Sequence, residues 1–178
     1  LGRKTGVNPH LWYDPATMPL IARALTNALN KADPANEADY EARLRLFDAS
    51  LDSIAAKIES IRKAHTGISV TATEPVFGYM ATALGFKMRN ERLQLAVMND
   101  TEPSARDVAA FENDLKTHNV SILFYNRQAS SAAAKYLLNI ATAAHVPVVG
   151  VTETEQAGAT YQSWMLDQLE AVGKALQK

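Results

Sequence analysis

The sequence of 178 residues contains no cysteine, which excludes disulfide bonds, thiolate metal ligands and cysteine nucleophiles. It also lacks an apolar run near the roughly 20 residues that a membrane-spanning helix needs. Neither sign of charge is in excess, because 18 Lys and Arg stand against 19 Asp and Glu, and basic residues do not cluster. Nucleic-acid binding is therefore not predicted.

Glycine and proline are few, at 8 and 7 residues, while 47% of the chain is hydrophobic, so the composition predicts a folded globular protein. The Gly-rich phosphate loops, the serine elbow of hydrolases and the paired-histidine zinc protease motif are all missing. Nucleotide binding, acyl transfer and zinc proteolysis therefore have no motif to support them. Because the sequence begins at Leu1, we expect it to be part of a longer protein.

The amino-terminal region predicts a polar and aromatic turn followed by a helix. Asp14 and Pro15 form a typical helix start, with a capping carboxylate before proline. Apolar residues keep helical spacing as far as Asp33 and Pro34, where the helix should stop. Pro19 lies inside this run, and we expect it to cause a tight turn or kink.

A second and longer helix is predicted from about residue 36 to 64. Its apolar residues recur at alternating intervals of four and three, namely Tyr40, Leu44, Phe47, Leu51, Ile54, Ile58 and Ile61. An uninterrupted helix of this length would extend roughly 42 Å. It could connect two bodies or simply pack along one core.

The rest of the chain alternates short apolar runs with helical patterns. Four strands are predicted, at residues 68–72, 93–98, 120–125 and 146–151, and each is followed by a helix. This order predicts an α/β fold in three layers, with a mainly parallel four-stranded sheet preceded by the long linking helix.

Polar residues follow each predicted strand, at Glu74, at 99–102, at 126–127 and at Glu153. Ligands of parallel sheets bind at the carboxyl ends of the strands, so a site is expected there. From the residues alone, the preferred interpretation is that Glu74 caps the helix at 75–84 and that Glu153 is a solvated loop carboxylate.

Four segments together carry a resemblance to a known family: residues 8–15 (NPHLWYDP), 70–79 (VTATEPVFGY), 151–154 (VTET) and 158–161 (GATY). They resemble the periplasmic solute-binding proteins of zinc and manganese ABC transporters. The resemblance implies two α/β lobes joined by one long helix, with the metal held between the lobes by four protein ligands.

The resemblance places three metal ligands in this chain. His10 corresponds to the family's second histidine, and Glu74 to a position that is His in zinc-binding members and Glu in several manganese-binding ones. Glu153 stands where the family usually has Asp, which departs from the pattern. Carboxylates favour harder ions, so manganese or ferrous iron is expected to fit this set, although zinc has the higher intrinsic affinity.

The resemblance also predicts the biological setting. It implies a periplasmic or membrane-associated extracytoplasmic protein that passes a divalent metal ion (manganese, zinc or iron) to an ABC transporter permease and is not an enzyme. The alternative is an α/β enzyme that uses Glu74, Glu153 and His10 as acid and base groups.

The predicted domains are residues 1–33, a remnant of the amino-terminal lobe with the Asn-Pro-His segment, 34–65, the linking helix, and 66–178, the carboxyl-terminal lobe. The family's first histidine would lie in the lobe before Leu1. With its ligands on two bodies, this chain alone is expected to bind metal poorly, and residues 1–33 could pair with a second copy of the chain.

Overall fold

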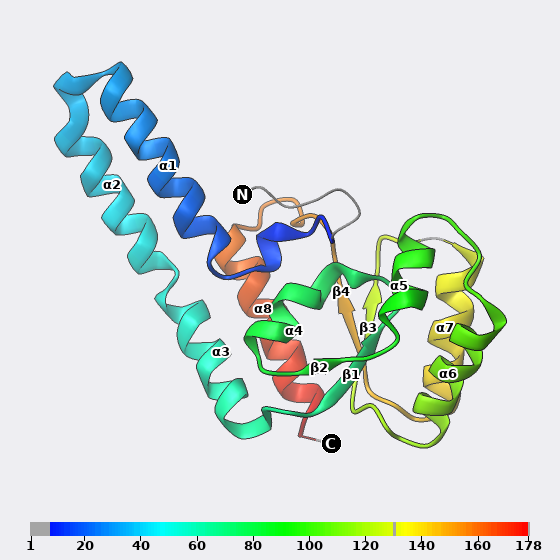
Figure 1. Ribbon diagram of the computed structural model, residues 1–178. Helices are drawn as coiled ribbons and strands as arrows, with labels where there is room; N and C mark the ends of the chain where they lie inside the picture. Colours follow the sequence, from blue (N-terminus) through cyan, green and yellow to red (C-terminus); the bar gives the residue numbers. More distant parts are fainter. Residues whose placement is uncertain (1–7, 130, 178) are drawn as a thin grey trace.

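The computed structural model describes residues 8–129 and 131–177, which form an α/β lobe with a helical arm projecting from it (Figure 1). In the lobe, four parallel strands are ordered β2-β1-β3-β4. The strands are β1 (Ser69–Ala72), β2 (Lys87–Met88), β3 (Leu123–Asn126) and β4 (Val148–Val151). The predicted parallel four-stranded sheet is confirmed.

Helices cover both faces of the sheet, which confirms the three layers. Neighbouring residues of β3 point to opposite faces, because Leu123 belongs to one apolar cluster and Phe124 to the other. The Phe124 face carries α3 (Asp52–His65), η3 (Pro75–Phe77), α4 (Gly78–Ala83) and α8 (Tyr161–Ala175). The Leu123 face carries α5 (Glu91–Met98), α6 (Ala105–Lys116) and α7 (Ala132–Ala143).

The predicted second strand is wrong, because residues 93–98 belong to helix α5. Leu93 and Val97 are both buried, and their spacing of four residues places them on one helical face. The alternation of apolar residues in this short run fits a strand equally well, so periodicity alone could not distinguish the two. The true strand is β2, which has only two residues and carries no apolar run.

The uninterrupted long helix is also wrong, because it breaks at Leu51 into α2 (Glu37–Ser50) and α3. At the break, Leu51 N donates to Asp48 O at 3.0 Å, which is a tighter turn than an α-helix makes. The Ser50 hydroxyl donates to Phe47 O at 2.6 Å and so competes for a helical carbonyl. The apolar residues of α2 and those of α3 therefore pack against different parts of the structure.

The apolar residues of α2 lie in the helical arm. There α2 runs beside α1 (Thr17–Ala32) and is joined to it through η2 (Pro34–Asn36). The apolar residues of α3 pack on the lobe, where Ile54, Ile58 and Ile61 are buried in the same apolar cluster as residues of α8. Helix α1 ends before Asp33 as predicted. Pro19 causes no kink, because it lies in the first turn, where a missing N–H is tolerated.

The division into residues 1–33, 34–65 and 66–178 stays a prediction. The structure adds that the segment around η1 (Leu11–Tyr13) lies against the lobe, since Tyr13 is fully buried in the same cluster as Phe77 and Trp164. Among the described residues, no helix is both long enough and apolar enough to cross a membrane.

Candidate functional site

Three adjacent strands bring polar side chains to one edge of the sheet. Glu74 follows β1, Asn126 ends β3 and Glu153 follows β4. Strands β1 and β3 lie next to each other, while the chain leaves β1 toward β2 on the opposite side. The site therefore lies where the strand order reverses, which is the usual ligand position in open parallel sheets.

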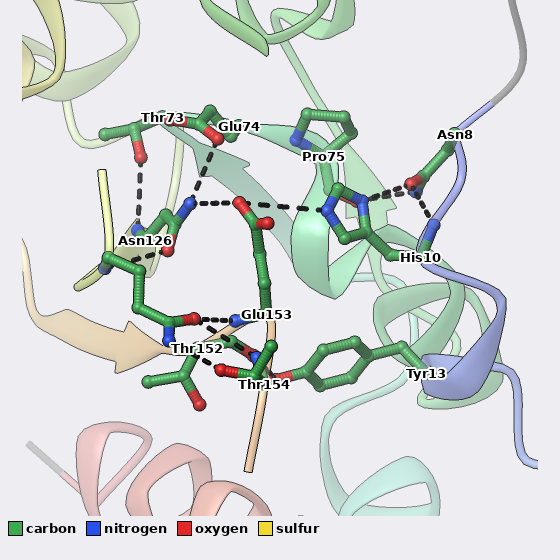
Figure 2. Close-up of polar contacts among 11 residues, drawn as sticks. Asn8, His10, Tyr13, Thr73, Glu74, Pro75, Asn126, Thr152, Glu153 and Thr154 are labelled. Carbon is green, nitrogen blue, oxygen red and sulfur yellow. Dashed lines mark hydrogen bonds and ion pairs between the residues drawn. The ribbon is translucent and has the colours of Figure 1, made fainter. Parts of the chain in front are cut away.

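Asn126 lies between the two carboxylates (Figure 2). Its Nδ2 atom donates to Glu153 Oε1 at 2.7 Å and to Glu74 Oε2 at 3.0 Å. Its Oδ1 atom accepts from the backbone N–H of Gln128 at 3.0 Å, which fixes the orientation of the amide. One buried amide thus joins the strand ends of β1, β3 and β4.

Glu74 does not act as the helix cap considered from the sequence. It precedes η3, but its side chain makes no capping hydrogen bond and instead accepts from Asn126. The side chain is buried, with 9% of its residue surface exposed. A buried carboxylate that is not used as a cap is a stronger candidate for a ligand.

The loop that carries Glu153 is held in place by Gln128. Its Oε1 atom accepts from the backbone N–H groups of Glu153 and Thr154, at 2.6 and 3.1 Å. Its Nε2 atom donates to the Thr154 hydroxyl at 2.7 Å. The position of the Glu153 backbone therefore depends on the loop after β3.

His10, near the amino-terminal end of the described residues, lies at the same site as Glu74 and Glu153. Asn8 donates its Nδ2 to Pro75 O, and its backbone carbonyl accepts from the Tyr79 hydroxyl at 2.7 Å. The Oδ1 atom of Asn8 accepts from His10 Nδ1 at 2.6 Å. The network thus assigns the proton to Nδ1 and leaves a lone pair on Nε2 in the neutral ring.

Tyr13 anchors the segment that carries His10. Its buried hydroxyl donates to Thr152 O at 2.7 Å and contacts Gln168 Oε1 at 2.8 Å. These two residues lie in the loop after β4 and in α8. The expectation that the three ligand candidates sit on two separate bodies is therefore wrong, since all three are held by the same lobe.

Burial shifts the pKa values of His10 and Glu74. Desolvation lowers the pKa of His10 below its ordinary 6.5, although the charge of Glu153 opposes this shift. Desolvation raises the pKa of Glu74 above 4.5, and the charges of Glu153 and Asp100 add to this, while the hydrogen bond from Asn126 opposes it. At neutral pH, His10 therefore offers a free lone pair.

The three predicted ligands lie near one another, but their donor atoms do not converge on a single point. His10 Nε2 lies 4.0 Å from Glu153 Oε1, and Glu74 is joined to Glu153 only through Asn126. As the side chains stand, no three acidic or histidine groups in residues 8–129 and 131–177 are close enough to hold a metal. Side-chain rotation is needed to bring them together.

The residues expected at the end of a second strand need a correction. Residues 99–102 follow helix α5 and not a strand, and Asn99 donates its side chain to Leu95 O of that helix. Sequence reasoning missed Asn8 and Gln128 as supporting residues. The Asn-Pro-His motif gave a signal for Asn8, whereas nothing in the sequence distinguished Gln128.

The chain resembles known metal-binding proteins along most of its length. It is 29% identical to the zinc-binding protein AdcA of Streptococcus pyogenes, over 96% of this chain and 33% of that protein. It is similar in fold to the periplasmic zinc binding protein TroA of Treponema pallidum, with a TM-score of 0.74 and 19% identity, over 94% of this chain and 63% of that one.

A manganese-bound periplasmic metal binding protein from Candidatus Liberibacter asiaticus is similar too, with a TM-score of 0.74 and 20% identity, over 95% of this chain and 63% of that one. The chain thus spans about a third of AdcA and under two thirds of the two solved structures. A family model described as zinc-uptake complex component A, periplasmic (ZnuA), matches residues 2–175. The chain therefore belongs to the ZnuA family, which confirms the resemblance seen in the sequence.

Proposed function

We propose that this chain captures a divalent metal ion outside the cytoplasm for delivery to the permease of an ABC transporter, and that His10, Glu74 and Glu153 are its ligands. One observation carries the proposal: the lone pair of His10 Nε2 faces a carboxylate oxygen at 4.0 Å. Two electron-pair donors that face each other are stabilised by a cation between them.

Glu74 completes the set after a rotation of its side chain toward Glu153. The donors would then be one nitrogen and at least two oxygens, with the remaining positions taken by water or by a donor outside the described residues. Zinc and manganese both accept imidazole and carboxylate ligands. The named relatives, which bind zinc in two cases and manganese in one, support the same two ions.

Membership of a periplasmic zinc-uptake family supports transport rather than the enzyme alternative. A solute-binding role needs a cation to be held and released, and none of the three side chains has to act as acid or base. The extracytoplasmic location and the permease partner follow from the same membership and belong to the proposal.

Titration calorimetry with zinc chloride and with manganese chloride tests the proposal. One lobe holds all three proposed ligands, which removes the reason for expecting the chain alone to bind metal poorly, so the unaltered chain should bind one ion. Glu74→Gln and Glu153→Gln should each lose most of the affinity, because each removes a charged ligand. Glu155→Gln is the matched control, since this exposed carboxylate lies two residues from Glu153 and should not matter. Equal affinity of Glu74→Gln and the unaltered chain would contradict the role of Glu74.

A further inference from the structure

We infer that Gly78 is a positioning residue for metal binding: its missing side chain leaves the space in which Asn8 docks, and Asn8 in turn orients the ring of His10. The inference rests on the proposed function, because it concerns one of the three proposed ligands. Gly78 acts only through Asn8 and is not itself a ligand.

The backbone of Gly78 does not require glycine. Its φ and ψ angles are −56° and −45°, which are ordinary helical values that other residues adopt freely. Gly78 is the first residue of α4, and glycine is less favourable than alanine in a helix. The reason for a glycine at this position therefore lies in its surroundings.

The surroundings of Gly78 leave little room for a side chain. A β-carbon at this position would lie 3.1 Å from the Nδ2 atom of Asn8, which is closer than ordinary van der Waals contact. Asn8 would have to move by a few tenths of an ångström to admit it. The consequence of a side chain at position 78 thus depends on whether Asn8 can move.

Asn8 is held by hydrogen bonds at three of its atoms. Its Oδ1 atom accepts from the backbone N–H of His10 at 3.1 Å and from Nδ1 of the His10 ring at 2.6 Å (Figure 2). Its Nδ2 atom donates to Pro75 O, and its backbone carbonyl accepts from the Tyr79 hydroxyl at 2.7 Å. A displaced Asn8 side chain would lengthen or lose some of these bonds, including the one that fixes the ring of His10.

The segment that receives Asn8 also carries a proposed ligand. Glu74 directly precedes Pro75, so Glu74 and the groups that bind Asn8 belong to one short stretch ending in the first turn of α4. The docking of Asn8 on this stretch therefore determines where His10 stands relative to Glu74. Gly78 is the position in the stretch at which an added side chain would disturb that relation.

The first test measures the zinc affinity of the full chain by competition with a chelating dye of known affinity. Gly78→Ala should weaken binding about tenfold, the lower end of the effect expected when a group that orients a metal ligand is disturbed. Unchanged affinity would contradict the inference. Circular dichroism should show that the variant is folded, because alanine favours a helix more than glycine does.

Gly173→Ala is the matched control for this substitution. Gly173 also lies in a helix, α8, but a β-carbon there would meet none of the described residues within 4 Å, apart from its chain neighbours and the backbone of its own helix. The zinc affinity of this variant should equal that of the unaltered chain. An equal loss in Gly78→Ala and Gly173→Ala would show that the space beside Asn8 is not the cause.

A double-mutant cycle tests whether Gly78 acts through Asn8. Asn8→Ala removes the side chain that the new β-carbon would meet. Gly78→Ala should therefore change the zinc affinity by less than about twofold when Asn8 is already alanine. The same tenfold loss in both backgrounds would show that Gly78 acts by another route and would overturn the inference.

Nitrogen-15 NMR of the metal-free chain gives a readout that needs no metal. The hydrogen bond to Asn8 should protect the Nδ1 proton of His10 from exchange with water. Its signal should be present in the unaltered chain and in Gly173→Ala, and weakened or lost in Gly78→Ala. His10→Gln identifies the signal by its disappearance. An unchanged signal in Gly78→Ala would contradict the displacement of Asn8.

The outcomes separate this inference from the proposed function. If Glu74→Gln abolishes zinc binding but Gly78→Ala leaves the affinity unchanged, the site stands and the role of Gly78 is contradicted. If the unaltered chain binds no zinc, the proposed function is contradicted, and the role of Gly78 in metal binding falls with it.

Discussion

His10 Nε2 and Glu153 Oε1 face each other across 4.0 Å, although one residue precedes the first long helix and the other follows the last strand. The contact depends on two anchors, Asn8 for the imidazole ring and Gln128 for the loop of Glu153. The lobe thus sets the distance between these two atoms through hydrogen bonds to the other ring nitrogen of His10 and to the backbone N–H of Glu153. This arrangement leads to predictions about the anchors as well as the ligands.

Asn8→Ala should weaken zinc binding about 10- to 100-fold, the effect expected when a histidine ligand loses the group that orients it. The substitution removes the acceptor for His10 Nδ1 and the donor to Pro75 O. Calorimetric titration with zinc measures the change. Asn30→Ala is a suitable control, because this amide contacts Glu41 in the helical arm. Unchanged affinity in Asn8→Ala would show that burial alone orients the ring.

Tyr13→Phe should lower the free energy of unfolding by about 1–3 kcal/mol, because Thr152 O loses a buried hydrogen bond. Urea denaturation followed by circular dichroism measures this. Tyr136→Phe is the matched control: its hydroxyl donates to Glu112 on the exposed surface, and the change should stay within about 0.5 kcal/mol. Equal effects of the two substitutions would contradict the anchoring role of Tyr13.

Ile61→Ala should destabilise the chain by about 2–5 kcal/mol, since it leaves a cavity where α3 packs on the lobe. Ile61 is 5% exposed, whereas Leu46 on α2 is 73% exposed. Leu46→Ala should therefore change the free energy of unfolding by less than about 0.5 kcal/mol. The pair of urea titrations tests whether the two halves of the broken helix have different roles. A large decrease in the free energy of unfolding for Leu46→Ala would indicate that the helical arm is covered in solution.

The sequence predicted the sheet where apolar runs are long and unambiguous, as at β1, β3 and β4. It failed at β2, because a two-residue edge strand that includes Lys87 has no apolar pattern to recognise. It failed at Leu51 for another reason. The apolar spacing continues through the break, where the hydroxyl of Ser50 binds the backbone carbonyl of Phe47. Spacing of apolar residues carries no information about such a local competition.

The site candidates came from a family resemblance and not from composition. Their three-dimensional neighbourhood could be predicted in part, because Glu74 and Glu153 follow parallel strands and such strand ends meet at one edge. Asn126 was noted at a strand end, but its place between two carboxylates depends on which strands are adjacent. The docking of His10 on the lobe depends on Asn8 and Tyr13, whose contacts are with residues far away in the sequence.

Glu74→Gln should stabilise the metal-free chain at neutral pH, although it removes a proposed ligand. Desolvation and the charge of Glu153 raise the pKa of Glu74 above 4.5 in the folded chain. The ionised side chain therefore costs folding free energy at neutral pH. This cost is relieved as the pH falls through the raised pKa, because the folded chain then takes up a proton. Glutamine is neutral throughout and carries no such cost.

Urea denaturation at pH 7.5 and at pH 5, with a chelator present, should therefore show a stability advantage of Glu74→Gln that is larger at the higher pH. With saturating zinc at pH 7.5 the order should reverse, because the ion binds the folded state of the unaltered chain and stabilises it by mass action. Glu155→Gln should show neither effect, since this carboxylate is exposed. A Glu74→Gln variant that is less stable than the unaltered chain in chelator would contradict the raised pKa. If zinc stabilised Glu74→Gln as much as the unaltered chain, Glu74 would not be a ligand.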